Sequence, residues 1–251
     1  MRDLVITLIV LGSLPPTLAM PHIGILMWSW LSFMNPHRLS WGFAFNFPFA
    51  QLVAITTLMG WVISREPKSI PWNRVTMLMV ALVVWINVTT LFTLVPEGTY
   101  PLWDRAMKML LMTFVALALM RTRERINLLV WVIALSIGFF GVKGGVFTLL
   151  TGGQYLVIGP PHSHISDNNT LAAALIMILP LMRYLQLTTE KWWVRMGLWG
   201  AMGLSICAAL GSYSRGAFLT LGVLTAIMVL RSRRRFVLTV GLTLLLAGGV
   251  T

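Results

Sequence analysis

A short polar break separates two apolar runs near the end of the chain and reads Gly211-Ser212-Tyr213-Ser214-Arg215-Gly216-Ala217. The guanidinium of Arg215 is a planar fork of donors that can hold a phosphate or diphosphate through paired hydrogen bonds. The small residues around it let a ligand approach the backbone. If a helix begins near Arg215, the unpaired N–H groups of its first turn add to the same anion site. The alternative is an arginine that only ends an apolar segment and extends toward water.

A single lysine, Lys143, lies within the apolar run 127–150 and is flanked by glycines. In a helix that rises about 1.5 Å per residue, it lies on the order of 10 Å from the end of that run. A lysine side chain is long enough to extend to the surface from there. The alternative is a cation that faces an internal cavity and complements an anionic headgroup. Both interpretations remain open.

A polar segment before the run at 170–187 reads His162-Ser163-His164-Ile165-Ser166-Asp167-Asn168-Asn169. Two histidines spaced i, i+2 with a nearby aspartate do not predict a metal site, because the sequence places no further ligand beside them. Asp167 fits an N-cap for a helix that begins near Thr170. The alternative is that His164 or Asp167 binds a substrate hydroxyl or transfers a proton.

Another polar segment reads Asn35-Pro36-His37-Arg38-Leu39-Ser40-Trp41-Gly42. Asn35 and Pro36 form an ordinary helix stop. Arg38 and His37 could form part of the polar rim of a binding site. The alternative is a turn at the membrane surface that is anchored by Trp41.

The segments of sequence between these polar residues are apolar and must form the structure that positions them. Of the 251 residues, 57% are hydrophobic and 10% are charged, and the mean hydropathy is +0.83. A soluble domain of this size cannot bury so much apolar surface, so the composition predicts an all-α, polytopic transmembrane helix bundle. The net charge of +12 does not indicate nucleic acid as a partner, because the basic residues form clusters between the apolar runs. Such clusters fit cytoplasmic loops that face anionic lipid headgroups.

About nine or ten membrane spans are expected, since a bilayer core of about 30 Å takes roughly 20 helical residues. The segment 3–34 contains three prolines and is interpreted as two short helices, with one kinked span as the alternative. Further spans are predicted at 44–63, 75–95, 107–120, 127–150, 170–187, 193–211, 215–230 and 236–251. Together they form one transmembrane domain, 1–251. Thr251 follows an apolar run without a polar tail, so we expect the natural chain to continue beyond it.

The loops between these spans differ in charge. Thirteen Lys or Arg fall in loops 64–74, 121–126, 183–195 and 231–235, whereas four fall in or beside loops 35–42, 96–106, 152–169 and 211–215. Because basic loops remain on the cytoplasmic side, the second group of loops is predicted to lie outside. The N-terminus and residue 251 are predicted on that outer side as well.

Four blocks of sequence resemble the O-antigen ligase and polymerase superfamily, and within it the O-glycosylation ligases associated with the exosortase A system. They are MRDL at the N-terminus, MNPHRLSWGFAFNFPFAQLVA at 34–54, SDNNTLAAALIMILPLMRYL at 166–185 and GSYSRGAFL at 211–219. The first two blocks are distinctive of the exosortase branch, and the SRGA element is shared more widely. The resemblance spans nearly the whole chain.

This resemblance implies a glycosyltransferase of the bacterial inner (cytoplasmic) membrane with an O-antigen-ligase-like fold. Such proteins move a glycan from a polyprenyl diphosphate carrier to an acceptor hydroxyl at the periplasmic face, and for this branch the acceptor is expected to be protein Ser or Thr. No metal or other cofactor is expected. The arginine of the SRGA element holds the diphosphate in the family, and that role carries over to Arg215. The family's key histidine lies in a later outer loop, and none of the histidines of this chain matches it.

The mechanism that we expect is inverting glycosyl transfer, in which Arg215, with Lys143 and Arg38, neutralises the leaving diphosphate. A base outside residues 1–251 takes the acceptor proton. One alternative is a polymerase whose acceptor is another lipid-linked glycan. Another is a transporter or flippase, which would predict inverted repeats and broken helices around a midplane site that the sequence does not display. A third is an inactive fragment or an assembly partner.

Overall fold

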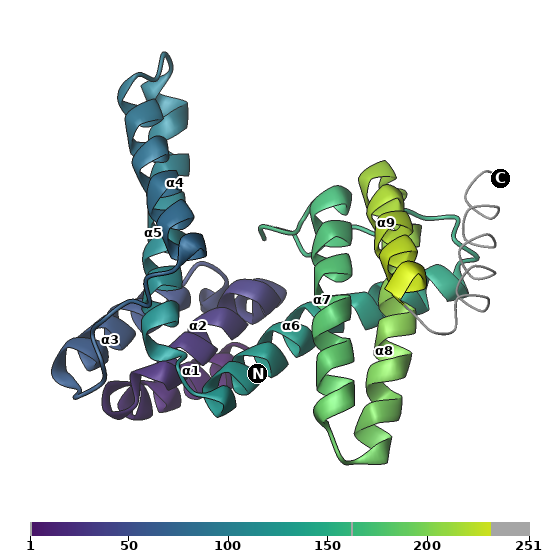
Figure 1. Ribbon diagram of the computed structural model, residues 1–251, viewed down its shortest axis with the longest axis horizontal. Coiled ribbons are helices and arrows are strands. Elements are labelled where there is room, and N and C mark those ends of the chain that lie inside the picture. The colour runs from purple at the N-terminus through teal and green to yellow at the C-terminus, as the bar shows by residue number, and fades with distance from the viewer. Residues whose placement is uncertain (1, 162, 232–251) are drawn as a thin grey trace. The chain divides into compact units, whose positions relative to one another are not determined.

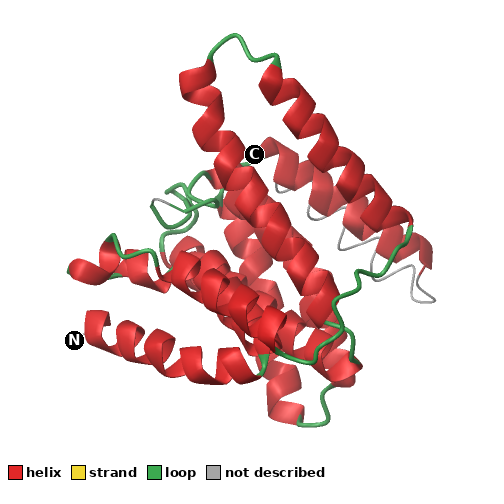
Figure 2. Ribbon diagram, turned by 90° about the vertical axis from the view of Figure 1, so that its left-hand side faces the viewer, coloured by secondary structure: helices red, strands yellow, loops and turns green. Residues whose placement is uncertain are grey.

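The computed structural model of the chain describes residues 2–161 and 163–231, and within this range all regular elements are helical (Figures 1 and 2). They are α1 (Arg2–Ala19), α2 (Pro21–Met34), η1 (Pro36–Leu39), η2 (Phe43–Phe45), α3 (Phe49–Ile63), α4 (Arg74–Leu91), α5 (Pro96–Leu119), α6 (Arg123–Leu150), α7 (Asn168–Thr188), α8 (Trp192–Gly211) and α9 (Arg215–Arg231). The predicted all-α fold is confirmed for these residues. The predicted span 236–251, most of the basic segment 231–235, and His162 lie outside them.

Five of the described helices are long and apolar enough to cross a membrane, namely α1, α4, α6, α7 and α8. Two shorter apolar helices are α3 and the part of α9 up to Ile227. A multi-pass membrane protein is compatible with this set of helices.

The N-terminal segment forms two helices, as predicted. The chain leaves the helical path at Met20, and α2 begins at Pro21. A residue before proline disfavours the α conformation, and a proline at the first helical position loses no hydrogen bond, which together account for the break. Pro15 and Pro16 do not interrupt a helix, because both lie inside α1.

The predicted outer loop 96–106 is helical, which corrects the sequence-based boundary of the fifth helix. α5 begins with Pro96 and carries Glu97 in its first turn, both of which favour a helix start. An ion pair of 2.6 Å joins Asp104 to Lys108 one turn further along. The polar residues that suggested a loop therefore lie on the first turns of a helix that pairs with α4 (Figure 1).

The chain divides into two compact units, and the boundary between the larger segments falls within α6, between Leu129 and Val130. The first unit holds residues 1–32 and 40–129, and the second holds 33–39 and 130–251. In the first unit, Val10, Leu31 and Val53 are fully buried where α1, α2 and α3 pack together. A second cluster joins Ile25 of α2 to α5.

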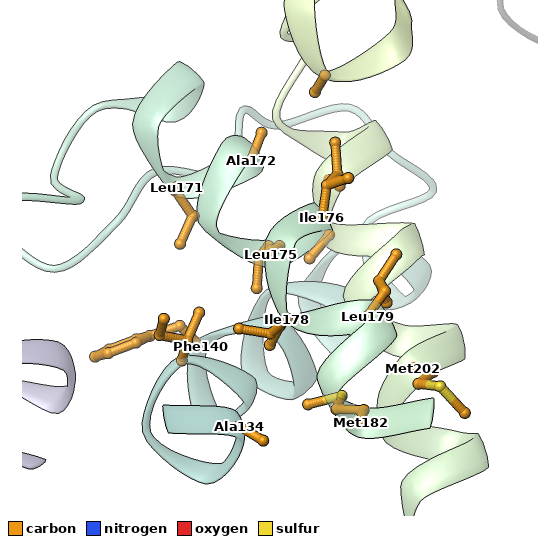
Figure 3. Close-up of a cluster of buried hydrophobic side chains, with 14 of the residues drawn as sticks. Ala134, Phe140, Leu171, Ala172, Leu175, Ile176, Ile178, Leu179, Met182 and Met202 are labelled. Carbon is orange, nitrogen blue, oxygen red and sulfur yellow. The ribbon is translucent and has the colours of Figure 1, made fainter. Parts of the chain in front are cut away.

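The second unit packs around α7, which lies beside α8 (Figures 1 and 3). Its core combines Ala134 and Phe140 of α6, a continuous face of α7 from Leu171 to Leu185, and Met202 of α8. A Cβ atom at Gly145 would overlap the backbone of Leu204. Glycine at this position therefore allows α6 and α8 to approach closely.

Candidate anion site at the start of α9

Arg215 is the first residue of α9, and the turn before it is built from buried serines. The Ser214 hydroxyl accepts a hydrogen bond from the Ala217 N–H at 3.2 Å, which is the geometry of an N-cap. The Ser212 hydroxyl donates to the Ala209 carbonyl at 2.6 Å and so closes the end of α8. The sequence-based expectation that a helix begins near Arg215 is confirmed.

Three consecutive residues of this turn are bonded to the preceding polar loop. The Gly211 carbonyl accepts from the Val157 N–H at 2.9 Å, and the Ser212 carbonyl accepts from Asn168 Nδ2 at 2.9 Å. The Tyr213 hydroxyl donates to the Gly153 carbonyl. The two segments that the charge pattern places on the predicted outer side are thus joined at one end of the second unit.

Asp167 is the N-cap of α7. Its carboxylate accepts from the Asn169 N–H at 2.9 Å and from the Thr170 N–H at 3.2 Å. The N-cap interpretation is therefore confirmed, and a contact of Asp167 with a substrate remains a prediction. Because Asn168 follows directly and bonds to Ser212, the starts of α7 and α9 are linked through one side chain.

The electrostatic environment of Arg215 favours an anion. The residue is exposed, and within residues 2–161 and 163–231 its guanidinium has no hydrogen bond or ion pair. The first turn of α9 contains no acidic residue. A cation beside the positive end of a helix is electrostatically unfavourable, and a bound anion would reverse the sign of that interaction. The arrangement can hold phosphate or diphosphate oxygens through the guanidinium and the first backbone N–H groups of α9.

Lys143 lies on the exposed face of α6. The buried residues Gly141, Gly144 and Gly145 face α7 and α8, whereas Lys143 is exposed together with Phe139 and Val146. Within the second unit, Lys143 therefore points away from the packed helices. This placement fits the interpretation of a side chain that extends to the membrane surface, and a contact of Lys143 with the carrier remains a prediction.

Arg38 belongs to η1, in a short segment that is part of the second unit. Arg38 is half-buried, and its neighbour His37 is buried. Burial lowers the pKa of His37 below its ordinary value, and the adjacent charge of Arg38 lowers it further. Both effects favour the neutral imidazole of His37. Phe33 of the same segment packs on the core around α7.

His164 is exposed in the loop between α6 and α7. No group of three or more His, Cys, Asp or Glu side chains in a metal-binding arrangement occurs in the described part of the chain. His162, the other histidine of this loop, lies outside it.

A second polar region of the first unit joins the segment between α3 and α4 to the segment between α5 and α6 and to the first turn of α6. Arg125 donates to both carboxylate oxygens of Glu66, at 2.6 and 3.0 Å, and to the Leu119 carbonyl. Arg121 donates to the Ser69 hydroxyl at 2.8 Å and to its carbonyl. The hydrogen bond from Arg125 holds the pKa of Glu66 below its ordinary value. Both loops are predicted to be cytoplasmic, and the structure brings them together.

Comparison with known families places the chain in one of them. Residues 1–190 match a family of unknown function, DUF5935. The chain belongs to this family. No curated protein and no solved structure matches it. The DUF5935 match covers Arg38, Lys143, His164 and Asp167, and it ends before the turn that carries Arg215.

Sequence reasoning assigned no role to Asn168 and Tyr213, although both lie in the polar segments that it selected. Each of them bonds to a residue more than 40 positions away. No periodicity or spacing in the sequence signals such a contact. One local signal was available, because an asparagine directly after a helix N-cap has its side chain beside the start of the helix, where it can bond to a neighbouring segment.

Proposed function

We propose that this chain is a glycosyltransferase that moves a glycan from a polyprenyl diphosphate carrier to an acceptor hydroxyl at the periplasmic face of the bacterial inner membrane. The acceptor would be a protein Ser or Thr or another glycan. The proposal assigns about nine or ten crossings to the whole chain, which includes the shorter helices and residues beyond 231. An O-antigen-ligase-like fold is part of the same proposal.

One observation carries the proposal: the exposed guanidinium of Arg215 begins a helix and lacks a hydrogen bond or ion pair within the described residues. An arginine in this position is unfavourable for the helix and favourable for a bound anion. The resemblance of GSYSRGAFL to the ligase and polymerase superfamily supports a diphosphate as that anion.

The reaction breaks the bond between the anomeric carbon and the diphosphate oxygen and forms a bond from that carbon to the acceptor oxygen. The electron pair of the broken bond leaves with the polyprenyl diphosphate, whose added negative charge Arg215 stabilises. Preorganised cationic donors of this kind contribute on the order of 10²- to 10³-fold in rate. The acceptor proton passes to a base that we do not assign to a residue of 1–251. Arg38 and Lys143 remain candidates for contact with the carrier.

The test is glycan transfer by membranes that contain the full-length protein and a polyprenyl-diphosphate-linked glycan. Arg215→Ala should reduce transfer at least a hundredfold without loss of membrane insertion. Arg65→Ala is the matched control, because Arg65 is also exposed but lies in a predicted cytoplasmic loop. Transfer by Arg215→Ala at the level of the control would refute the assignment. Solute movement in vesicles with no covalent product would instead favour a transporter.

A further inference from the structure

The segment that precedes Arg215 is fixed at three successive residues. The carbonyl groups of Gly211 and Ser212 and the hydroxyl of Tyr213 bond to Val157, Asn168 and Gly153, respectively. Gly153 and Val157 lie in the loop between α6 and α7, and Asn168 is the first residue of α7. A turn that needed only to reverse the chain would not require a separate tertiary hydrogen bond at each residue.

Tyr213 has a backbone conformation that tyrosine rarely adopts. Its φ angle is 51°, in the left-handed region, and its partner Gly153 also has a positive φ of 76°. A non-glycine residue in this region persists where the surrounding structure imposes it. The hydrogen bond between these two residues therefore joins two positions with left-handed backbone, and it is one of three contacts that hold the turn before α9.

The loop that supplies the partners is itself packed. The Gly159 N–H donates to the Ser166 carbonyl at 3.1 Å, so the loop closes on itself. Val157 is buried in the core of the second unit, beside helices α7 and α8. Ala217 and Leu221 of α9 belong to the same core. The described residues of the loop and the start of α9 therefore share one core.

We propose that Asn168 and Tyr213 are positioning residues that hold the Arg215 guanidinium and the first N–H groups of α9 in the arrangement that binds a diphosphate. This inference rests on the proposed function of Arg215. In this arrangement the loop between α6 and α7 supports the anion site through its backbone. Its side chains need not contact the carrier.

The experiment compares Asn168→Ala and Tyr213→Phe with Tyr155→Phe in the full-length purified protein. Tyr155 is an exposed tyrosine of the same loop whose ring lies 6.3 Å from that of Phe147, and it is the matched control for the loss of a hydroxyl. Amide hydrogen exchange is measured without ligand in peptides that cover 155–159 and 211–216. Affinity for inorganic pyrophosphate is measured on the same samples.

Asn168→Ala and Tyr213→Phe should raise exchange in both peptides and weaken pyrophosphate binding about fivefold to tenfold, as expected for the loss of one hydrogen bond. Saturating pyrophosphate should return the exchange of 211–216 to the wild-type level, which a general loss of folding would not allow. Tyr155→Phe should change neither quantity.

Unchanged exchange in both variants would overturn the inference, because the turn would not depend on these contacts. Raised exchange with wild-type pyrophosphate affinity would also overturn it, because the position of the turn would not matter for binding. Wild-type affinity and transfer in Arg215→Ala would instead overturn the proposed function, while the exchange data still report on the support of the turn. Absence of pyrophosphate binding by the wild type would overturn both.

Discussion

Two hydrogen-bonded networks are named for the sides of the membrane on which the charge pattern predicts them. The inner network, which we define as Glu66, Ser69, Arg121 and Arg125, joins the segment between α3 and α4 to the start of α6 through charged side chains. The outer network, defined as Gly153, Val157 and Asn168 with residues 211–213, joins the segment before α7 and its first residue to the Arg215 turn through backbone and neutral side-chain groups. Both bond residues that are more than 40 positions apart. They differ in whether the guanidinium groups of their arginines bond within the protein.

In the inner network the guanidinium groups bond within the protein. Arg125 and Glu66 have only 22% and 21% of their side chains exposed, so each charge is largely neutralised by the other. In the outer network the hydrogen bonds fix the turn, and Arg215 remains exposed with no internal partner among the described residues. The contrast supports a structural role for the inner arginines, and it supports the proposal that Arg215 binds a ligand.

The largest expected effect on stability is that of Arg125→Ala. It removes both hydrogen bonds to Glu66 and leaves a partly buried carboxylate without its partner, which costs about 2 kcal/mol after allowance for partial exposure. The melting temperature of the purified protein, followed by the fluorescence of its 11 tryptophans, should fall by several degrees. A melting temperature equal to that of the wild type would contradict a structural role for the inner network.

The interaction between Glu66 and Arg125 should also make the stability of the wild type depend on pH, and Glu66→Gln should reduce that dependence. The pKa of Glu66 is lowered below the ordinary value of 4.5, so its contribution is fully present above about pH 4.5 and is lost as the pH falls through the lower pKa of the folded protein. Near neutral pH the variant should lose about 1 kcal/mol. Between pH 6 and 3 the wild type should lose more stability than the variant, and parallel curves would contradict the ion pair.

Arg215→Ala should change stability in the opposite direction. Removal of a cation from the positive end of α9 should leave the melting temperature unchanged or raise the stability by about 0.5 kcal/mol, while transfer is lost. Thermal melts of Arg215→Ala and Arg125→Ala in the same detergent make the comparison direct. A clear destabilisation by Arg215→Ala would mean that Arg215, like Arg125, serves mainly the fold.

The smallest effect is expected for Lys108→Ala. Its ion pair with Asp104 is exposed, with 63% and 53% of the two side chains accessible. Exposed pairs of this kind contribute about 0.3 to 0.5 kcal/mol. The melt of this variant sets the baseline against which the inner network is judged, and a loss equal to that of Glu66→Gln would show that burial does not explain the difference.

Local signals in the sequence predicted much of the fold. Apolar runs located the helices that the structure describes, and the aspartate before Thr170 was the N-cap that its position indicates. The prolines of α1 and the start of α5 were harder. A proline pair can lie within a helix, as Pro15 and Pro16 do in α1. The exposed polar residues at 100–108 are compatible with a helix surface and with a loop, so their type does not decide between the two.

The candidate site could be predicted only in part. The helix start at Arg215 could be predicted from one short segment of sequence, whereas anion binding by Arg215 stays a prediction. The contact between Asn168 and Ser212 depends on how α7 packs against α8 and α9, which no local pattern specifies. The exposed position of Lys143 depends in the same way on which face of α6 carries the close-packed glycines.

The most direct test of the central claim uses a cysteine beside Arg215. Gly216 has space for a side chain, since the nearest atom to an added Cβ lies 3.9 Å away. In a Cys207→Ala background, Gly216→Cys should react with a membrane-impermeant maleimide in spheroplasts, and inorganic pyrophosphate should slow the reaction several-fold unless Arg215→Ala is also present. Labelling only after permeabilisation, or at a rate that pyrophosphate does not change, would contradict an outward-facing diphosphate site at Arg215.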